Sequence, residues 1–282
     1  MKAWSVQRLP FEPKGAMLQF RTEIRQGLQA MVAPSGDVLH AVYGSLSEDL
    51  VDAENVLFYN VGTSHFTHLA NDGIRFERAY EQPPQIPKAV DYIPKHYHRY
   101  MTTGRQDEFT HWHRGQTLAT WADSNCGPIT SSLKVPAVWL GIKLAAHTLS
   151  DPSHTPPKQF GVSVHLRYGA KQTNIHPATV VKPLLDGIIA AFHQHAWGSK
   201  YDAEVLKRLT AVTGRSVSEL IKILAAPGVL GPRLLVYCHG MGLQWNPKDE
   251  DCMAAEILLV QDTGGDGVQV SGELFEVVAR NA

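Results

Sequence analysis

Residues 252–278, with the sequence CMAAEILLVQDTGGDGVQVSGELFEVV, predict two strands separated by a turn. Residues 252–261 and 268–278 are rich in the aliphatic side chains that strands favour. The residues between them, 263–267, are almost all of kinds that tolerate tight turns. Outward from this pair, the hydrophobic pattern predicts further strands at residues 38–43, 56–61, 73–80, 116–121, 135–144, 160–168 and 233–238.

Helical periodicity is confined to fewer segments. Apolar side chains recur at helical spacing in residues 17–31, 183–195, 202–213 and 216–225. Strands interleaved with few helices predict an α+β fold with mixed or antiparallel sheets and flanking helices, and they exclude a doubly wound parallel sheet. We expect residues 135–144 and 160–168 to pair as antiparallel strands. Residues 81–114, rich in Pro, His and Tyr, predict a long irregular excursion.

The order of these elements is coarsely duplicated along the chain. Each half offers strands, a polar segment that carries acids or a lysine, and then a further strand. We therefore predict two related α+β halves, residues 1–130 and residues 131–282. Each half carries one or more of the polar motifs described below.

The composition limits the classes of protein. The 282 residues include 26 Lys plus Arg and 27 Asp plus Glu, for a formal net charge of −1, with 44% hydrophobic and 19% charged residues. These values exclude a uniformly basic coat protein, an acidic disordered tail and a polybasic membrane-surface protein. Three widely spaced cysteines indicate neither a disulfide framework nor a cysteine-rich zinc module. Without a signal-peptide pattern or a membrane-length apolar run, we expect a cytoplasmic protein with no membrane partner.

The first polar motif is Asp52-Ala53-Glu54-Asn55, which lies between two predicted strands. In an extended segment residues i and i+2 project to the same side, so Asp52 and Glu54 could present two carboxylates to one hard cation. A magnesium-dependent phosphodiesterase needs such an arrangement. The alternative interpretation is an acidic loop that connects two strands.

The second motif is Lys182-Pro183-Leu184-Leu185-Asp186-Gly187, at a predicted helix start. Lys182, Asp186 and His193 are spaced by four and seven residues, which places them on one stripe beside the apolar face of the helix. From that stripe they could reach a cleft. The alternative is a surface ion pair with a solvated histidine nearby.

The third motif is the acidic run Asp249-Glu250-Asp251, directly before the strand predicted from residue 252. Asp249 and Asp251 again have i, i+2 spacing, and so dense a negative charge is either neutralised or used. The alternative is an Asn-Pro turn with solvated acids.

A histidine-rich region offers a different chemistry. His111 and His113 lie on one side of a strand-like segment and could bind a transition metal with Cys126 or with the pair Cys238-His239. The simpler interpretation is a polar, partly aromatic surface loop. Motifs of P-loop, dinucleotide-binding and nucleophile-elbow type are absent from the sequence.

Taken in order, the three acidic and lysine motifs resemble those of the RusA-like Holliday-junction resolvases. That family carries Asp-x-Asp-Asn, then a Lys with a Leu-Asp on a helix, and then an Asp pair that leads into a strand. Asp52, Glu54 and Asn55 resemble its first motif, whereas Lys182, Leu185, Asp186, Asp249 and Asp251 resemble the later ones. The chain departs from the family at Phe58, where the first half should hold the lysine, and at His176 and Ala178, where the second half should hold the first acids.

The resemblance implies a small α+β endonuclease that acts as a homodimer and binds magnesium through its acids. Our leading hypothesis is therefore a pseudo-dimer of two RusA-like halves that hydrolyses phosphodiesters of branched DNA or another nucleic acid. Magnesium or manganese would be held by Asp52, Glu54, Asp249 and Asp251. Lys182 would neutralise phosphate charge, and Asp186 would orient Lys182 or the metal-bound water.

Two alternatives remain. The departures at His176 and Ala178 favour a non-catalytic binding or scaffold protein that keeps the fold. Such a protein would bind another protein or form a homo-oligomer. The histidine-rich region keeps open an unrelated transition-metal enzyme. The net charge of −1 gives no support to a nucleic-acid partner, although bases gather within residues 8–25 and 95–114 and leave room for a local positive face.

Overall fold

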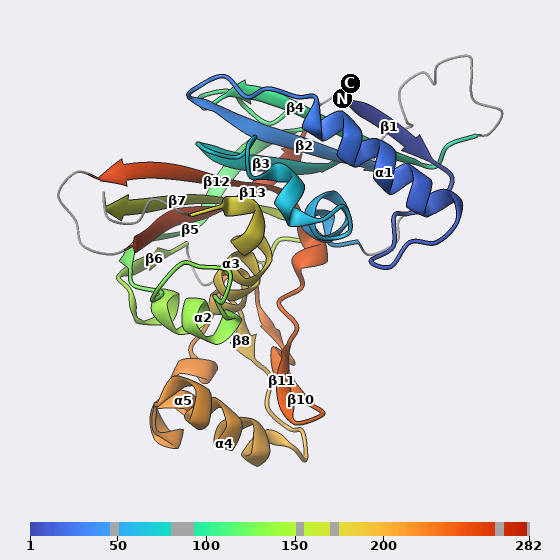
Figure 1. The fold of residues 1–282 in the computed structure, drawn as a ribbon. Coiled ribbons are helices and arrows are strands. Elements are labelled where there is room, and N and C mark those ends of the chain that lie inside the picture. The colour runs from blue at the N-terminus through green and yellow to red at the C-terminus, as the bar shows by residue number, and fades with distance from the viewer. Residues whose placement is uncertain (46–50, 80–92, 151–154, 170–174, 263–267, 281–282) are drawn as a thin grey trace.

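The computed structural model describes residues 1–45, 51–79, 93–150, 155–169, 175–262 and 268–280. Within these residues, nine strands form one mixed sheet that runs through the body of the molecule (Figure 1). The predicted α+β class is thereby confirmed. In spatial order the strands are β1 (Lys2–Ser5), β4 (His96–Gly104), β2 (Asp37–Ser45), β3 (Gly73–Ala79), β12 (Cys252–Asp262), β7 (Phe160–Gly169), β13 (Val268–Ala279), β5 (Trp112–Ser124) and β6 (His147–Leu149).

Strand directions divide the sheet into two similar parts. β2 pairs with β3 in parallel, and β7 pairs with β12 in parallel. All other neighbours in this sheet are antiparallel, including β3 and β12, where the two parts meet. In each part the strand that follows the parallel pair lies antiparallel beside the first member of that pair: β4 beside β2, and β13 beside β7.

The chain therefore repeats one topology. The first repeat runs β1, α1 (Ala16–Gln29), β2, a helical connection, β3 and β4; the helical connection contains η1 (Asn55–Tyr59) and η2 (Thr63–Phe66). The second runs β5, α2 (Val135–Leu144), β7, α3 (Pro177–Ala191), β12 and β13. By this order β5 belongs to the second repeat, although the division of the chain at residue 130 assigns it to the first half.

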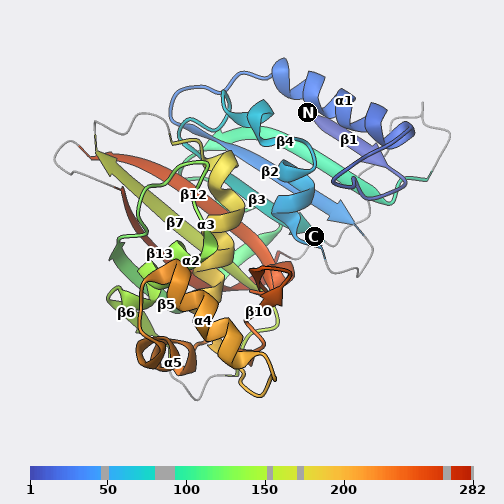
Figure 2. The ribbon, with the colours of Figure 1, turned by 60° about the horizontal axis from the view of Figure 1, so that its bottom comes forward.

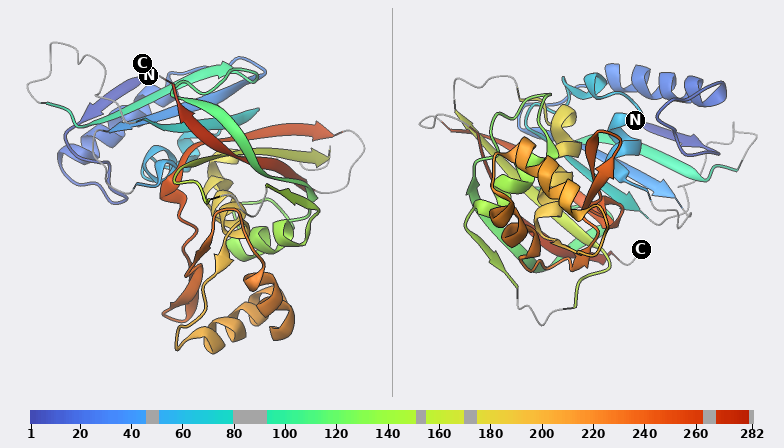
Figure 3. Two further views of the ribbon diagram at one scale, coloured as in Figure 1. Left: turned by 180° about the vertical axis from the view of Figure 1, so that it is seen from behind. Right: turned by 90° about the horizontal axis from the view of Figure 1, so that it is seen from below.

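An insertion separates α3 from β12 and has no counterpart in the first repeat. It projects from the body as an arm (Figures 1 and 3). Within it, Ser216 caps α5 through a capping box with Glu219, as the sequence predicts. The arm contains β8 (Gln194–His195), α4 (Asp202–Thr213), α5 (Val217–Ala225), β9 (Pro232–Arg233), β10 (Val236–His239) and β11 (Gly242–Trp245).

The main helices pack on one face of the sheet, as Figure 2 shows for α3 over the strands of the second repeat. Because side chains alternate along a strand, every second residue of the central strands enters the core beneath these helices. Among them are Leu39 and Ala41 of β2, Ile74 and Phe76 of β3, Val162 and Val164 of β7, and Ile257 and Leu259 of β12. No helix in the described part of the chain is long and apolar enough to cross a membrane.

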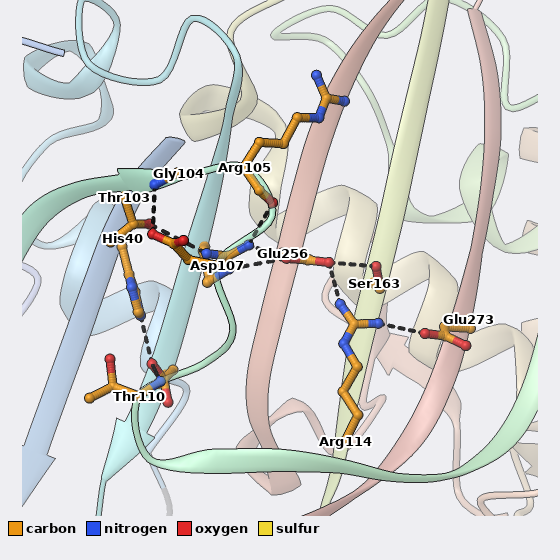
Figure 4. A network of polar contacts seen from close by, with 12 residues as sticks. His40, Thr103, Gly104, Arg105, Asp107, Thr110, Arg114, Ser163, Glu256 and Glu273 are labelled. Atoms are coloured by element: carbon orange, nitrogen blue, oxygen red, sulfur yellow. Dashed lines mark hydrogen bonds and ion pairs between the residues drawn. The ribbon is translucent and has the colours of Figure 1, made fainter. Parts of the chain in front are cut away.

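The opposite face of the sheet carries a buried polar network, drawn in Figure 4. Arg75 of β3 donates to Glu256 of β12 at 2.9 and 3.1 Å, and Arg114 and Ser163 also contact Glu256. Nearby, His40 lies 2.6 Å from Glu77. Every residue of β3 is buried, so this strand is covered on both faces of the sheet.

Two predicted strands are helical instead. The strand predicted at residues 56–61 is largely the π-helix η1 (Asn55–Tyr59), and residues 135–144 form α2. Both are short apolar runs, and such runs do not distinguish a buried helix from a buried strand. The helix predicted over residues 183–195 begins earlier, because α3 starts at Pro177, and proline is favoured in the first turn.

Two predicted connections also differ. The excursion predicted over residues 81–114 contains the whole of β4 and the start of β5, whereas residues 80–92 lie outside the described residues. The turn predicted at residues 263–267 also lies outside them, but the strands that it joins are not neighbours: β7 lies between β12 and β13. The antiparallel pairing of residues 135–144 with 160–168 is wrong, because the former are a helix.

Candidate active site

Lys182 of α3 lies at the centre of a carboxylate cluster. Its Nζ is 2.8 Å from Asp249 Oδ2, 3.1 Å from Glu54 Oε1, 3.3 Å from Asp186 Oδ1 and 3.7 Å from Asp52 Oδ2. Only the Lys182–Asp186 pair lies within one element, at the i, i+4 spacing of a helix. The remaining partners come from segments more than sixty residues away, so the cluster is a product of the fold.

The first repeat supplies Asp52 and Glu54. Both precede η1, in the connection from β2 to β3. Asn55 Nδ2 donates to Asp52 Oδ2 at 2.6 Å, and Val56 N donates to the Asp52 carbonyl at 3.3 Å, which fixes the start of this helical turn. The Asp52 side chain is 30% exposed, whereas that of Glu54 is 3% exposed, so the cluster has an outer and an inner end.

The second repeat supplies Lys182, Asp186 and Asp249. Asp249 belongs to η3 (Asp249–Asp251), directly before β12. The two ring nitrogens of buried His193 lie 3.0 Å from the Gly231 carbonyl and 2.9 Å from the Pro247 carbonyl. His193, which the sequence placed on the same helix stripe as Lys182, therefore ties the end of α3 to the segment that carries Asp249.

Mutual repulsion and burial distribute the protons of the cluster unevenly. Burial raises the pKa of Asp186 to about 8 in spite of Lys182, and burial raises the pKa of Glu54 well above its ordinary value. Burial also acts to raise the pKa of Asp249, but the Lys182 ammonium and the hydrogen bonds that Asp249 accepts outweigh it and lower that pKa. Burial disfavours the Lys182 ammonium, yet the carboxylates around it raise its pKa. Asp249 is therefore the ionised partner of Lys182, while Glu54 and Asp186 retain protons more readily.

Two groups of carboxylates in the described residues have a spacing that could hold a metal ion. Asp52, Asp249 and Glu250 form the outer group, and Glu54, Asp186 and Asp249 form the inner group; within each, the ligand atoms lie within 4.8 Å of one another. Lys182 contacts all three members of the inner group. The ammonium thus already neutralises the inner group, which leaves the outer group as the better candidate for a cation.

The structure brings together five of the six residues singled out from the sequence, namely Asp52, Glu54, Lys182, Asp186 and Asp249. Asp251 is the exception, because its carboxylate pairs with Lys248 and joins neither group. Glu250 joins the outer group instead. The i, i+2 rule used for Asp249 and Asp251 applies to extended chain, but these residues form a 3₁₀ turn, which changes the side that each faces.

Equivalent positions of the two repeats explain why the site is single. Asp52 lies seven positions after the end of β2, and His176 lies seven positions after the end of β7. The same offset matches Glu54 to Ala178, Phe58 to Lys182 and Gly62 to Asp186. Each repeat therefore retains the part that the other lacks, and the two parts meet around Lys182.

Neither group contains a histidine or a cysteine among the described residues. His113 is exposed and lies 4.0 Å from the Glu108 carboxylate, and Cys126 is buried. The acidic cluster is thus the stronger candidate for a metal site than the histidine-rich region. No family model matches this chain, and comparisons with curated proteins and with solved structures find no match either.

Proposed function

We propose that this protein is a metal-dependent nucleic-acid phosphodiesterase whose single active site is shared by its two repeats. The observation that carries the proposal is the convergence of Asp52, Glu54, Asp186 and Asp249 on Lys182. Oxygen ligands of this type suit Mg²⁺ or Mn²⁺. The RusA-like resemblance of the motifs supports the same reaction, and the shared site accounts for the departures at His176 and Ala178.

The exposed and the buried residues of the cluster would have different roles. Asp52, Asp249 and Glu250 would hold the metal ion at the more exposed end of the cluster. The ion would supply Lewis-acid stabilisation of phosphate charge and an activated water. Lys182 would neutralise charge that develops on the phosphate, while Glu54 and Asp186 hold its ammonium in place.

Matched substitutions within one acidic turn test the proposal. Asp249→Asn removes the carboxylate shared by both groups, whereas Asp251→Asn alters a neighbour whose carboxylate pairs with Lys248 and joins neither group. With branched and linear DNA or RNA in Mg²⁺ or Mn²⁺, we expect the first to abolish cleavage and the second to retain most of it. Where supercoiled plasmid is cut, the single site predicts nicked circles before any linear product. Absence of cleavage of every substrate by the unsubstituted protein would refute the proposal.

A non-catalytic binding protein is the second candidate. Four carboxylates that contact one lysine are also what a structural ion-pair cluster requires, because a buried charge must be paired. In that case nucleic acid or a protein partner would bind without being cut. Metal titration separates the two candidates, since a structural cluster needs no Mg²⁺ and Asp52→Asn would then leave Mn²⁺ binding unchanged.

A further inference from the structure

A cavity of about 560 Å³ opens directly beside the outer end of the carboxylate cluster. Its lining combines Asp52 and Asn55 with Arg8 and Phe11, which belong to the segment between β1 and α1. The volume falls within the range of roughly 300–1,000 Å³ that is typical of small-molecule sites. The cavity therefore has room for a ligand that touches Asp52 on one side and the Arg8–Phe11 segment on the other.

The Arg8–Phe11 segment is held firmly against the active-site turn. Leu9 is fully buried, and its carbonyl accepts a hydrogen bond of 2.7 Å from Asn60 Nδ2, which lies just after η1. Pro10 directly precedes Phe11, the buried Pro13 lies two residues after it, and each ring fixes the φ angle of its own residue. The Phe11 ring is nevertheless 66% exposed. A large aromatic ring is thus held in solvent at the rim of the cavity.

Arg8 adds a positive charge to the lining of the cavity, beside the aromatic Phe11. Arg8 is exposed, and it has no ion-pair partner among the residues that the structure describes. An aromatic ring beside a free guanidinium is the combination that proteins use to bind single-stranded nucleic acid, with a base stacked on the ring and a phosphate on the cation. A base within a duplex offers no free face for such stacking, whereas an unpaired base does.

We propose that this cavity holds an unpaired nucleotide of the substrate strand, with its base stacked on Phe11 and a phosphate bound by Arg8, next to the phosphodiester at Asp52. The proposal rests on the proposed function, because it names the substrate class of that same site. It restricts the substrate to strands with an unpaired nucleotide beside the bond that is broken. Flaps, gaps, loops and branch points satisfy this requirement, whereas continuous duplex does not.

Binding in EDTA tests the cavity without requiring cleavage. The probes are a fluorescein-labelled single strand of about a dozen nucleotides and the corresponding blunt duplex, followed by fluorescence anisotropy. We expect the single strand to bind more tightly. Phe11→Ala should weaken binding of the single strand by about 5- to 150-fold, the equivalent of the ~1–3 kcal/mol that stacking of one base contributes. Phe11→Trp should retain the binding.

Arg8→Gln supplies a second, independent readout. Loss of one phosphate contact should lower the slope of log affinity against log salt by about 0.7 for the single strand. Met241→Ala, at an almost fully exposed position of the projecting arm, is the matched control and should change neither quantity. Thermal melting establishes that each variant is folded.

The outcomes distinguish this proposal from the proposed function. Equal affinity for single strand and duplex, or no effect of Phe11→Ala, would overturn the cavity assignment even if Mg²⁺-dependent cleavage is observed. Selective, Phe11-dependent binding without cleavage of any substrate would support the nucleotide site and refute the phosphodiesterase. If neither probe binds, the cavity assignment fails, whereas the phosphodiesterase is still decided by the cleavage assay.

Discussion

The two repeats of this chain share a topology but contribute different halves of one site. The first repeat presents Asp52 and Glu54 from a short π-helical turn, and it places buried Phe58 where the second repeat has Lys182. The second presents Lys182 and Asp186 from a fifteen-residue helix, and it has Ala178 where the first has Glu54. In two identical subunits every position is used twice. Within one chain, a charged residue of one repeat can be replaced by an apolar one wherever the other repeat keeps the charged residue at the equivalent position.

Substitution of Lys182 by an apolar residue tests this difference most directly, because the equivalent residue of the first repeat, Phe58, is apolar. Lys182→Met leaves Glu54, Asp186 and Asp249 without their shared cation, and removal of one partner from a buried charged cluster typically costs about 3–5 kcal/mol. Because the pKa values of Glu54 and Asp186 are raised, these carboxyls are protonated more at pH 5 and carry more charge at pH 8. Without Lys182 that charge is unpaired, so the loss of stability should be larger at pH 8 than at pH 5. Urea unfolding at the two pH values measures it.

The matched control is Phe58→Leu in the first repeat. It removes buried apolar volume and should cost on the order of 1–2 kcal/mol at both pH values, because no ionisable group replaces the ring. If Lys182→Met is as mild as Phe58→Leu, or independent of pH, the cluster does not depend on its central ammonium.

Metal binding provides the second comparison. Glu54 and Asp186 hold protons that repulsion from a bound cation would expel, so Mn²⁺ should stabilise the protein more at pH 8 than at pH 6. At free metal one hundred times the dissociation constant, the gain is about 2.7 kcal/mol. Asp52→Asn should abolish most of the gain. His176→Asn, at the equivalent position, should preserve it; an equal loss in both variants would show that the ion does not bind at the outer group.

Buried histidines offer a third comparison between the repeats. Burial lowers the pKa of His98 on β4 to about 3, and burial lowers the pKa of His193, at the end of α3, to about 4. A lowered pKa means that the unfolded chain binds protons that the native protein does not, so stability present above pH 6.5 is lost as the pH falls. Each histidine contributes up to about 1.4 kcal/mol per pH unit over that range.

Substitution separates the two histidines. His98→Phe should flatten the decline of unfolding free energy between pH 6.5 and 5, because an aromatic ring without a titrating nitrogen replaces it in a fully buried site. His193→Gln should also flatten the decline, but it should weaken metal binding in addition, since His193 holds the Pro247 carbonyl ahead of Asp249. A decline unchanged by either substitution would assign acid sensitivity to other groups.

The sequence predicts most of this site because its parts depend on local spacing. The i, i+4 relation of Lys182 and Asp186 is fixed by any helix, and acids next to strand ends meet when those strands share a sheet. The errors arose where local geometry differed from the assumed one. Because residues 249–251 form a 3₁₀ turn, Glu250 rather than Asp251 joins the outer group, and the apolar runs at 56–61 and 135–144 are largely helical.

Two features were beyond the reach of pattern analysis. The meeting of acids from one repeat with the lysine of the other depends on the antiparallel contact of β3 with β12, which no local signal encodes. Arg8 and Phe11 belong to a proline-bounded segment without periodicity, so their place beside Asp52 follows only from tertiary contacts such as the Asn60 hydrogen bond to the Leu9 carbonyl.

The smallest expected effect concerns one pair of equivalent residues near the start of the two helical segments. Asn55 donates to the Asp52 carboxylate, and Thr179, at the matching position, donates at 2.8 Å to the His176 carbonyl. Either substitution by alanine removes one hydrogen bond and should cost about 0.5–1.5 kcal/mol in urea unfolding. Only Asn55→Ala should also weaken Mn²⁺ affinity by a few fold, because burial raises the pKa of the Asp52 carboxyl and the Asn55 amide opposes that rise. If Thr179→Ala weakens the affinity equally, the start of α3 also contributes to the outer group, and the contributions of the two repeats differ less than their equivalent positions indicate.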